Sequence, residues 1–134
     1  LEVAFGIDLF DQNWYKEICS QVCNKYLPCD GRPKRYQIIE SDCFIIDKAI
    51  FKKPINIYLY DADHSVRAHE NAFTYFNEVF ANIFIAIIDD WNSDQTRRGT
   101  FNAFKKLGYK ISYEAEIPAG DLTGNGQYIV VIHK

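Results

Sequence analysis

The segment INIYLYDADHS, residues 55–65, joins a strand-like run to a cluster of polar groups. Residues 55–60 are β-branched, aromatic and aliphatic, apart from one asparagine, which predicts a β-strand. Asp61, Asp63 and His64 follow at the point where this strand ends. The segment therefore predicts a strand whose carboxyl end carries groups able to do chemistry.

A helix is predicted from about Val66 to Phe80. Apolar residues recur there at helical spacing, which predicts one buried helix face; they are Ala72, Phe73, Phe76, Val79 and Phe80. The next strand is predicted over Ile83–Ile88, a run that is apolar throughout and therefore suits a strand covered on both faces, as in a parallel sheet. Asp89 and Asp90 follow it.

The rest of the chain continues the alternation of strands and helices. We predict a strand over 3–9, a helix over 13–26, a strand over 36–40, a short helix or turn within 44–51, a helix that follows Asn92 and ends at Leu107, and strands over 110–117 and 128–132. Gly108 is a helix stop, and the glycine-rich link 119–126 allows the last strand to return antiparallel. The pattern predicts an α/β fold with a mostly parallel sheet.

Size and composition agree with one folded domain over residues 1–134. Hydrophobic residues make up 48% and aromatic residues 16%, enough for a core. The formal charge of −3 is too small to indicate a nucleic acid or an anionic membrane as partner. No apolar stretch approaches the roughly 18 residues of a membrane span, and the first residues do not form a signal peptide.

The four cysteines, at positions 19, 23, 29 and 43, are not spaced like a zinc site. We interpret them as reduced thiols in or near a core, which favours a cytoplasmic protein.

The polar groups at the two strand ends are the main candidates for function. The carboxyl ends of adjacent parallel strands share one side of a sheet, where ligands bind in such folds. Clustered carboxylates repel each other unless a cation or a shared proton compensates, and hard divalent cations such as Mg²⁺ prefer oxygen ligands. The alternative is that these residues only cap the following helices.

Other polar residues carry weaker signals. Asp8 ends the first predicted strand, where a carboxylate commonly binds ribose hydroxyls, although it also suits a helix cap. We interpret His69 and His133 as surface or packing residues. Trp91 is either the wall of a pocket or, more simply, part of the core.

In order, these segments resemble the class I S-adenosylmethionine (SAM)-dependent methyltransferases. The closest resemblance is to small-molecule O-methyltransferases of the macrocin and caffeoyl-CoA types. It rests on the strand-end sequences YLYDADH (58–64) and IIDDWN (87–92), the RGT at 98–100, the FGID at 5–8 and the ESDCF at 40–44. It implies a Rossmann-like three-layer sandwich, with a mostly parallel sheet and an antiparallel C-terminal strand.

The resemblance also implies roles for particular residues. Asp61, Asp89 and Asp90 would hold a divalent metal ion. Asp63 would be the general base, with His64 as the alternative. A SAM site would include four acids, with Asp8 at the ribose and Asp42 near the adenine; the four are Glu2, Asp8, Asp42 and Asp61.

The activity implied is metal-assisted transfer of a methyl group from SAM to the hydroxyl of a small molecule or sugar. The protein would be a cytoplasmic transferase with no nucleic-acid or membrane partner, and a homodimer is compatible with this class. Two alternatives stay open. One is a truncated or degenerate methyltransferase fold that serves as a binding or assembly module. The other is a different Mg²⁺-dependent α/β enzyme, such as a phosphoryl-transfer protein, which no P-loop supports.

One element of the family has no counterpart in this sequence. No G-x-G-x-x-G-like run precedes Asp8, whereas the family opens with a strand, a glycine-rich loop and a helix. Leu1-Glu-Val3 resembles the end of that opening strand. We therefore expect that the missing segment exists outside this sequence and that Val3 and Ala4 are not neighbours in the gene product. Strand donation by another chain and direct pairing of the flanking strands are the alternatives.

Overall fold

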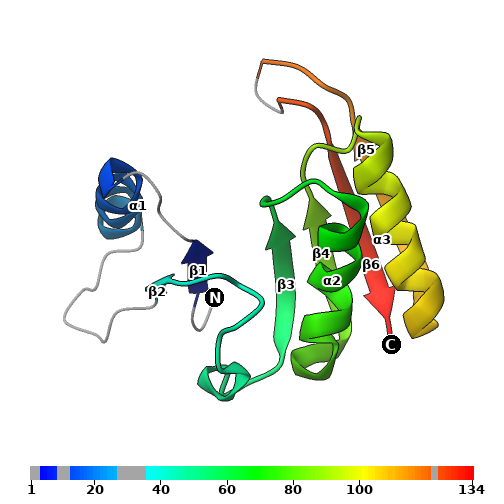
Figure 1. Ribbon diagram of the computed structural model, residues 1–134, viewed down its shortest axis with the longest axis horizontal. Coiled ribbons are helices and arrows are strands. Elements are labelled where there is room, and N and C mark those ends of the chain that lie inside the picture. Colours follow the sequence, from blue (N-terminus) through cyan, green and yellow to red (C-terminus); the bar gives the residue numbers. More distant parts are fainter. Residues whose placement is uncertain (1–3, 9–12, 27–35, 122–123) are drawn as a thin grey trace. The chain divides into compact units, whose positions relative to one another are not determined.

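The structure is a computed structural model that describes residues 4–8, 13–26, 36–121 and 124–134. The chain divides into two compact units, Leu1–Asp47 and Lys48–Lys134. The single domain expected from the chain length stays a prediction. Figure 1 traces both units in sequence colours.

The first unit contains one strand–helix–strand element. Strands β1 (Ala4–Asp8) and β2 (Tyr36–Glu40) pair in parallel, with Ala4 opposite Tyr36 and Asp8 opposite Glu40. Helix α1 (Asn13–Tyr26) lies between them in sequence. The predicted bounds of the helix and of the second strand are therefore confirmed. Parallel pairing follows from the helical crossover, because only a long connection returns the chain to the same end of the sheet.

The second unit is a four-stranded mixed sheet with two helices. Its elements are β3 (Ile55–Tyr60), α2 (Val66–Phe76), β4 (Phe80–Ile88), α3 (Asp94–Leu107), β5 (Lys110–Ile117) and β6 (Gln127–His133). The strand order is β3-β4-β6-β5. Strand β4 runs parallel to β3, and β6 runs antiparallel to both β4 and β5. The predicted antiparallel return of the last strand is thus confirmed.

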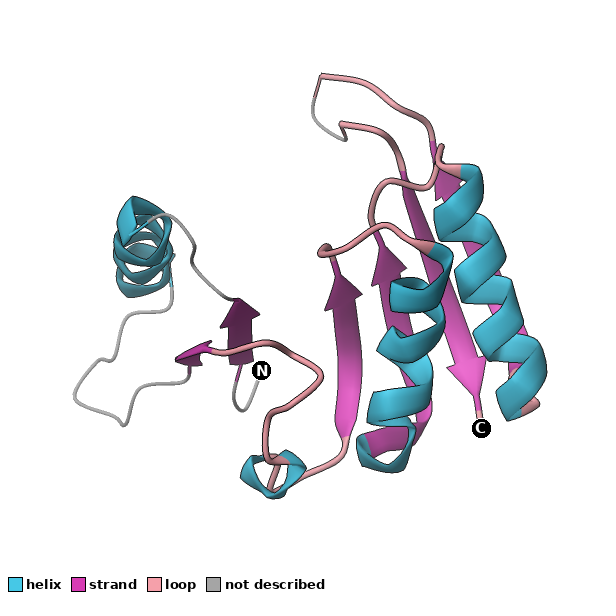
Figure 2. Cartoon of the chain, in the orientation of Figure 1, coloured by secondary structure: helices cyan, strands magenta, loops and turns pink. Residues whose placement is uncertain are grey.

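Helices α2 and α3 lie side by side on one face of this sheet (Figure 2). Alternate residues of β4 and β6 point into the core beneath them, because side chains alternate between the two faces of a strand. The buried apolar residues of the layer include Ala72, Phe73, Phe76, Phe80, Phe84, Ala86, Ile88, Ala103, Phe104, Tyr128, Val130 and Ile132. This layer holds the ends of β3 and β4 in fixed positions.

Two predicted boundaries are wrong by three or four residues. Helix α2 ends at Phe76 rather than Phe80, and a short 3-10 turn, Asn77–Val79, follows it. Strand β4 begins at Phe80 rather than Ile83, since Phe80 is already extended, with φ −72° and ψ 145°, and buried. Phe80 is buried on the same face of the strand as Phe84, Ala86 and Ile88, so the alternation of buried residues includes the start of the strand.

The ambiguous segment between β2 and β3 is a turn followed by a single 3-10 turn, Lys48–Ile50. On the other side of β4, Ile83 and Ile85 are exposed among the described residues. Coverage of β4 on both faces therefore stays a prediction. None of the described helices is long and apolar enough to cross a membrane.

Candidate functional site at the ends of strands β3 and β4

The turn after β3 is shaped by helix capping. Ser65 is the N-cap of α2, and its side chain accepts a hydrogen bond from the backbone N–H of Ala68. Asp63 Oδ1 accepts a hydrogen bond from the backbone N–H of Ser65 at 2.8 Å. This backbone hydrogen bond, followed by one from the Ser65 side chain, holds the pKa of Asp63 below its usual value. Asp63 is thus an exposed, ionised carboxylate with a structural contact in the turn.

The turn after β4 places Asp90 in an uncommon backbone conformation. Asp90 has a φ of +52°, in the left-handed region that aspartate tolerates better than most residues. Its carbonyl accepts a hydrogen bond from the backbone N–H of Ser93, the N-cap of α3, at 3.0 Å. The backbone N–H of Asp89 donates to the carbonyl of Tyr60 at 3.2 Å, which ties the ends of the two strands together.

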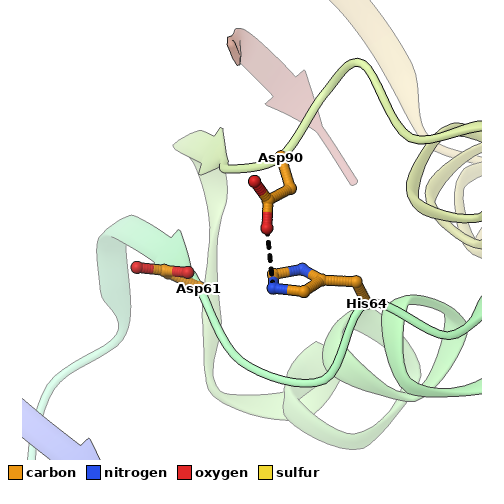
Figure 3. A group of neighbouring side chains, drawn as sticks. All are labelled: Asp61, His64 and Asp90. Carbon is orange, nitrogen blue, oxygen red and sulfur yellow. Dashed lines mark ion pairs between the residues drawn. The ribbon is translucent and has the colours of Figure 1, made fainter. Parts of the chain in front are cut away.

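These turns bring Asp61, His64 and Asp90 into one group (Figure 3). Each offers a ligand atom, and the three atoms lie within 4.8 Å of one another. His64 Nε2 lies 2.7 Å from Asp90 Oδ2, and their side chains are 41% and 20% exposed, so the pair is open to solvent. Strand ends that are adjacent in the sheet thus place three residues predicted from the sequence at one point.

Asp89, the third residue of the metal set expected from the sequence, is not in this group. It is half-buried, and its Oδ1 is buried without a hydrogen-bond partner in the part of the chain that the structure describes. Both residues lie after the end of β4, and the left-handed backbone of Asp90, with a φ of +52°, turns its side chain away from that of Asp89. Whether Asp89 binds a metal stays a prediction.

Asn125 is a residue of this site that the sequence analysis missed. Its Nδ2 donates to Asp90 Oδ1 at 2.6 Å. Its carbonyl accepts from the backbone N–H of Asn92, and the carbonyl of Gly126 accepts from that of Trp91, both at 3.0 Å. The link before β6 is therefore tied to the turn after β4. The only sequence signal was the glycine-rich character of this link.

Gly126 explains part of that glycine content. Its φ is +85°, and a Cβ there would lie 2.9 Å from the carbonyl oxygen of Ile117. Both the backbone conformation and the close approach require glycine.

Trp91 packs in the core directly behind the site. Its ring stacks on Tyr128 with centroids 4.1 Å apart and contacts Phe101 edge-on at 5.5 Å. The side chain of Arg97 donates from Nε to the Trp91 carbonyl at 2.6 Å. Trp91 is only 2% exposed, so the core role expected as the simpler interpretation is confirmed.

His69 is a second imidazole close to the group but fully buried. It is 0% exposed, packs edge-on against Tyr60, and its ring centroid lies 6.0 Å from that of His64. Burial lowers its pKa to about 4, with a smaller contribution from nearby His64. His69 is therefore neutral at physiological pH and fills the packing role expected of it. His133 contacts Ser112 at 2.9 Å on the surface.

The residues expected to bind SAM are described unevenly. Glu2 lies outside the described residues, and only the backbone of Asp8 is described, at the carboxyl end of β1. Asp42 Oδ1 accepts a hydrogen bond from the backbone N–H of Phe44 at 2.8 Å, which shapes its own turn. Asp61 belongs to the group with His64 and Asp90. The roles of these four residues towards SAM stay predictions.

Comparison with known proteins supports the fold. No family model and no curated protein matches the sequence. Among solved structures, a "putative SAM-dependent methyltransferase" from Streptococcus mutans matches with a TM-score of 0.62 and 14% identity over 98% of this chain and 38% of that one. The methyltransferase domain of bacterial CtHen1 matches with a TM-score of 0.54 and 15% identity over 100% and 79%.

Other proteins share this fold under different descriptions. A "putative hemolysin" from Streptococcus thermophilus matches with a TM-score of 0.58 and 8% identity over 99% of this chain and 51% of that one. At such identities the likeness shows the fold and not the activity. The chain has the Rossmann-like α/β fold found in these methyltransferases. It spans 38% to 59% of the length of the first three structures that it matches.

Proposed function

We propose that the protein is a SAM-dependent methyltransferase that acts on a hydroxyl group of a small molecule or sugar, with the help of a divalent cation. The observation that carries this proposal is the group formed by Asp61, His64 and Asp90. It lies beyond the carboxyl ends of β3 and β4, where α/β sheets bind their ligands. The methyltransferase-like fold supports SAM as the methyl donor.

The reaction requires little covalent chemistry from the protein itself. SAM, when bound, would supply its methyl group to the hydroxyl oxygen, and the bond from that carbon to sulfur would break to leave a neutral thioether. The hydroxyl proton leaves to a base. The protein has to align oxygen, carbon and sulfur and to promote loss of the proton.

The donor atoms of the group fit a divalent cation, because two carboxylates and one imidazole converge, and carboxylate and imidazole groups are common ligands of such ions. A bound cation would lower the pKa of the hydroxyl and orient it. Asp61 and Asp90 would hold the cation, and we keep Asp89 as a further candidate ligand. Asp63 and His64 are the two candidates to receive the proton.

Other features of the protein are proposed with the function. The SAM site would draw on Glu2, Asp8, Asp42 and Asp61. Cys19 and Cys23 are free thiols, which supports a reducing, cytoplasmic location. We propose no nucleic-acid or membrane partner, and a homodimer as the assembly.

Calorimetric titration with SAM tests the proposal directly. We expect saturable binding of one SAM per chain, and no binding of adenosine mixed with methionine at the same concentration. Asp8→Ala should weaken SAM binding by roughly 1.5–3 kcal/mol, as for a lost hydrogen bond between a carboxylate and its ligand. A protein that folds but does not bind SAM would instead be a non-catalytic binding or assembly module.

A further inference from the structure

We propose that His64 is a ligand of the cation through Nε2, and that the site therefore takes a transition-metal ion that accepts imidazole, such as Zn²⁺, in preference to Mg²⁺. This inference rests on the proposed function, because it concerns the same site. It departs from the all-carboxylate metal set that the sequence suggested, Asp61, Asp89 and Asp90.

The positions of the donor atoms support a shared ligand role for His64. Its Nε2 is already directed at Asp90 Oδ2, 2.7 Å away, and the Asp61 carboxylate completes a set within 4.8 Å. Ligand atoms around a four-coordinate Zn²⁺ lie about 3.4 Å apart, given metal–ligand distances of about 2.1 Å. Small side-chain movements therefore suffice to place a cation between these three groups.

The buried side of the His64 ring disfavours the alternative role as a base. In an Asp–His pair that acts as a base, the aspartate holds one ring nitrogen and the substrate meets the other. Here Asp90 faces Nε2, while Nδ1 is buried and has no partner among the described residues. No substrate reaches Nδ1 in this arrangement, so the nitrogen open to a ligand is the one that faces Asp90.

The protein also fixes the orientation of Asp90. Asn125 donates to Oδ1 at 2.6 Å, which leaves Oδ2 for His64 and for a cation. Polar groups that hold a metal ligand in place in this way are usual around protein metal sites. The hydrogen bonds from Asn92 and Trp91 to the backbone of residues 125 and 126 hold Asn125 there.

The donor set determines the class of metal. Imidazole nitrogen suits Zn²⁺, Fe²⁺, Ni²⁺ and Cu²⁺, whereas Mg²⁺ and Ca²⁺ take oxygen ligands. Asp89, the oxygen donor that an Mg²⁺ site would need in place of His64, is outside the group. With His64 as a ligand, Asp63 is left as the residue that receives the hydroxyl proton.

Imidazole ¹⁵N NMR of the protein during titration with Zn²⁺ tests the inference, because the chain has three histidines whose signals can be followed separately. We expect the Nε2 signal of His64 to move to a metal-bound position and to reach its end point at one equivalent. The His69 and His133 signals should not move to metal-bound positions, which assigns the bound zinc to His64. A 100-fold excess of Mg²⁺ should not reverse the shift.

Variants define the other ligands. Asp61→Asn and Asp90→Asn should each weaken Zn²⁺ binding at His64 at least tenfold, while Asp94→Asn, an exposed acid in the first turn of α3, should leave it unchanged. The inference is wrong if the His64 signal stays in place when Zn²⁺ saturates the protein, as it would for zinc held only by thiols. It is equally wrong if excess Mg²⁺ displaces the zinc.

The outcome is separable from that of the proposed function. SAM titration of the protein before zinc is added reports the donor site separately, because Asp61 is a candidate contact of both ligands. If zinc binds at His64 but the protein does not bind SAM, the proposed metal site is supported and the proposed methyltransferase function is contradicted. If the protein binds SAM but the His64 signal does not change with zinc, the methyltransferase function is supported and the metal site at His64 is contradicted.

Discussion

At the scale of single residues, His64 is the side chain on which the site depends. It makes the 2.7 Å contact with Asp90 and lies on the open side of the strand ends. Its replacement should reveal whether the group activates the acceptor hydroxyl.

We expect His64→Gln to lower the rate of methyl transfer by about 10²-fold or more, since activation of a reacting hydroxyl typically contributes roughly 10²- to 10⁴-fold. SAM affinity should stay the same, because none of the contacts proposed for SAM includes this side chain. Single-turnover methyl transfer and SAM titration measure the two effects. Thr74→Ala, on the far part of α2, is a matched control. An unchanged rate in His64→Gln would remove the group from the reaction.

His69 gives a prediction about the pH dependence of stability. Its pKa is about 4 in the folded protein, against about 6.5 in an unfolded chain. Between these pH values the unfolded state binds more protons than the folded state. The contribution of His69 to the free energy of unfolding is therefore fully present above about pH 6.5 and is lost as the pH falls towards 4. The free energy of unfolding should decrease by roughly 2–3 kcal/mol from pH 7 to pH 4.5 on account of this residue.

Urea unfolding of the protein and of His69→Leu at the two pH values isolates this contribution. Carboxylates contribute equally to the pH dependence of stability in the two proteins. Any difference in pH dependence between the two proteins therefore comes from His69. Identical pH dependence in the two proteins would show that His69 is accessible to protons in the folded state.

The candidate site illustrates what the sequence predicts at this scale. Asp61, His64 and Asp90 were predictable, because each lies within four residues of the end of a strand and adjacent parallel strands end on the same side. The separation of Asp89 from Asp90 depends on a backbone φ of +52°, which no local pattern revealed. Asn125 was not predictable, because it reaches Asp90 from a link 35 residues further along the chain.

At the scale of elements, the contact between α2 and α3 depends on Gly99. A Cβ at this position would lie 2.4 Å from the carbonyl oxygen of Val66 and 2.6 Å from the Cβ of His69. Neither atom belongs to the flexible end of a side chain, so the helices themselves would have to move apart. Glycine is thus required here for close packing.

We therefore expect Gly99→Ala to destabilise the protein by about 1–3 kcal/mol, the usual cost of overpacking a core, despite the higher helix propensity of alanine. Asn102→Ala, at an exposed position of the same helix, should be neutral or slightly stabilising. Chemical denaturation measures both. A Gly99→Ala protein as stable as the unmodified one would mean that α2 and α3 are not packed as described.

The elements themselves were largely predictable, because their periodicity is strong and their caps are polar. Ser65 and Ser93 start α2 and α3, and Gly108 ends α3 in the left-handed conformation with a φ of +70°. The incorrect prediction that Phe80 belongs to the helix has a physical cause. Phe76 and Phe80 are four residues apart, which matches a helix face, but Phe80, Phe84, Ala86 and Ile88 also match one face of a strand, and tertiary packing decided between the two.

At the scale of the whole molecule, the order of strands accounts for the place of the site. The parallel pair β3 and β4 forms one side of the second sheet, and the antiparallel β6 brings its preceding link back to the end of β4. The general fold class followed from the alternation of strands and helices. The position of β6 between β4 and β5 required the observed hydrogen-bonded register, since a sequence pattern does not specify strand order.

Binding of SAM should also be visible as a stabilisation of the whole protein. A ligand that binds only the folded state adds RT ln(1 + [L]/Kd), which is about 2.7 kcal/mol at a concentration of 100 times Kd. We expect SAM at that concentration to raise the free energy of unfolding by this amount, and adenosine mixed with methionine to have no effect. Asp8→Ala should retain the stability of the free protein but lose most of the gain at the same SAM concentration, because its Kd is higher. A gain that Asp8→Ala keeps in full would exclude Asp8 from the SAM site, and no gain in the unmodified protein would argue against SAM as its ligand.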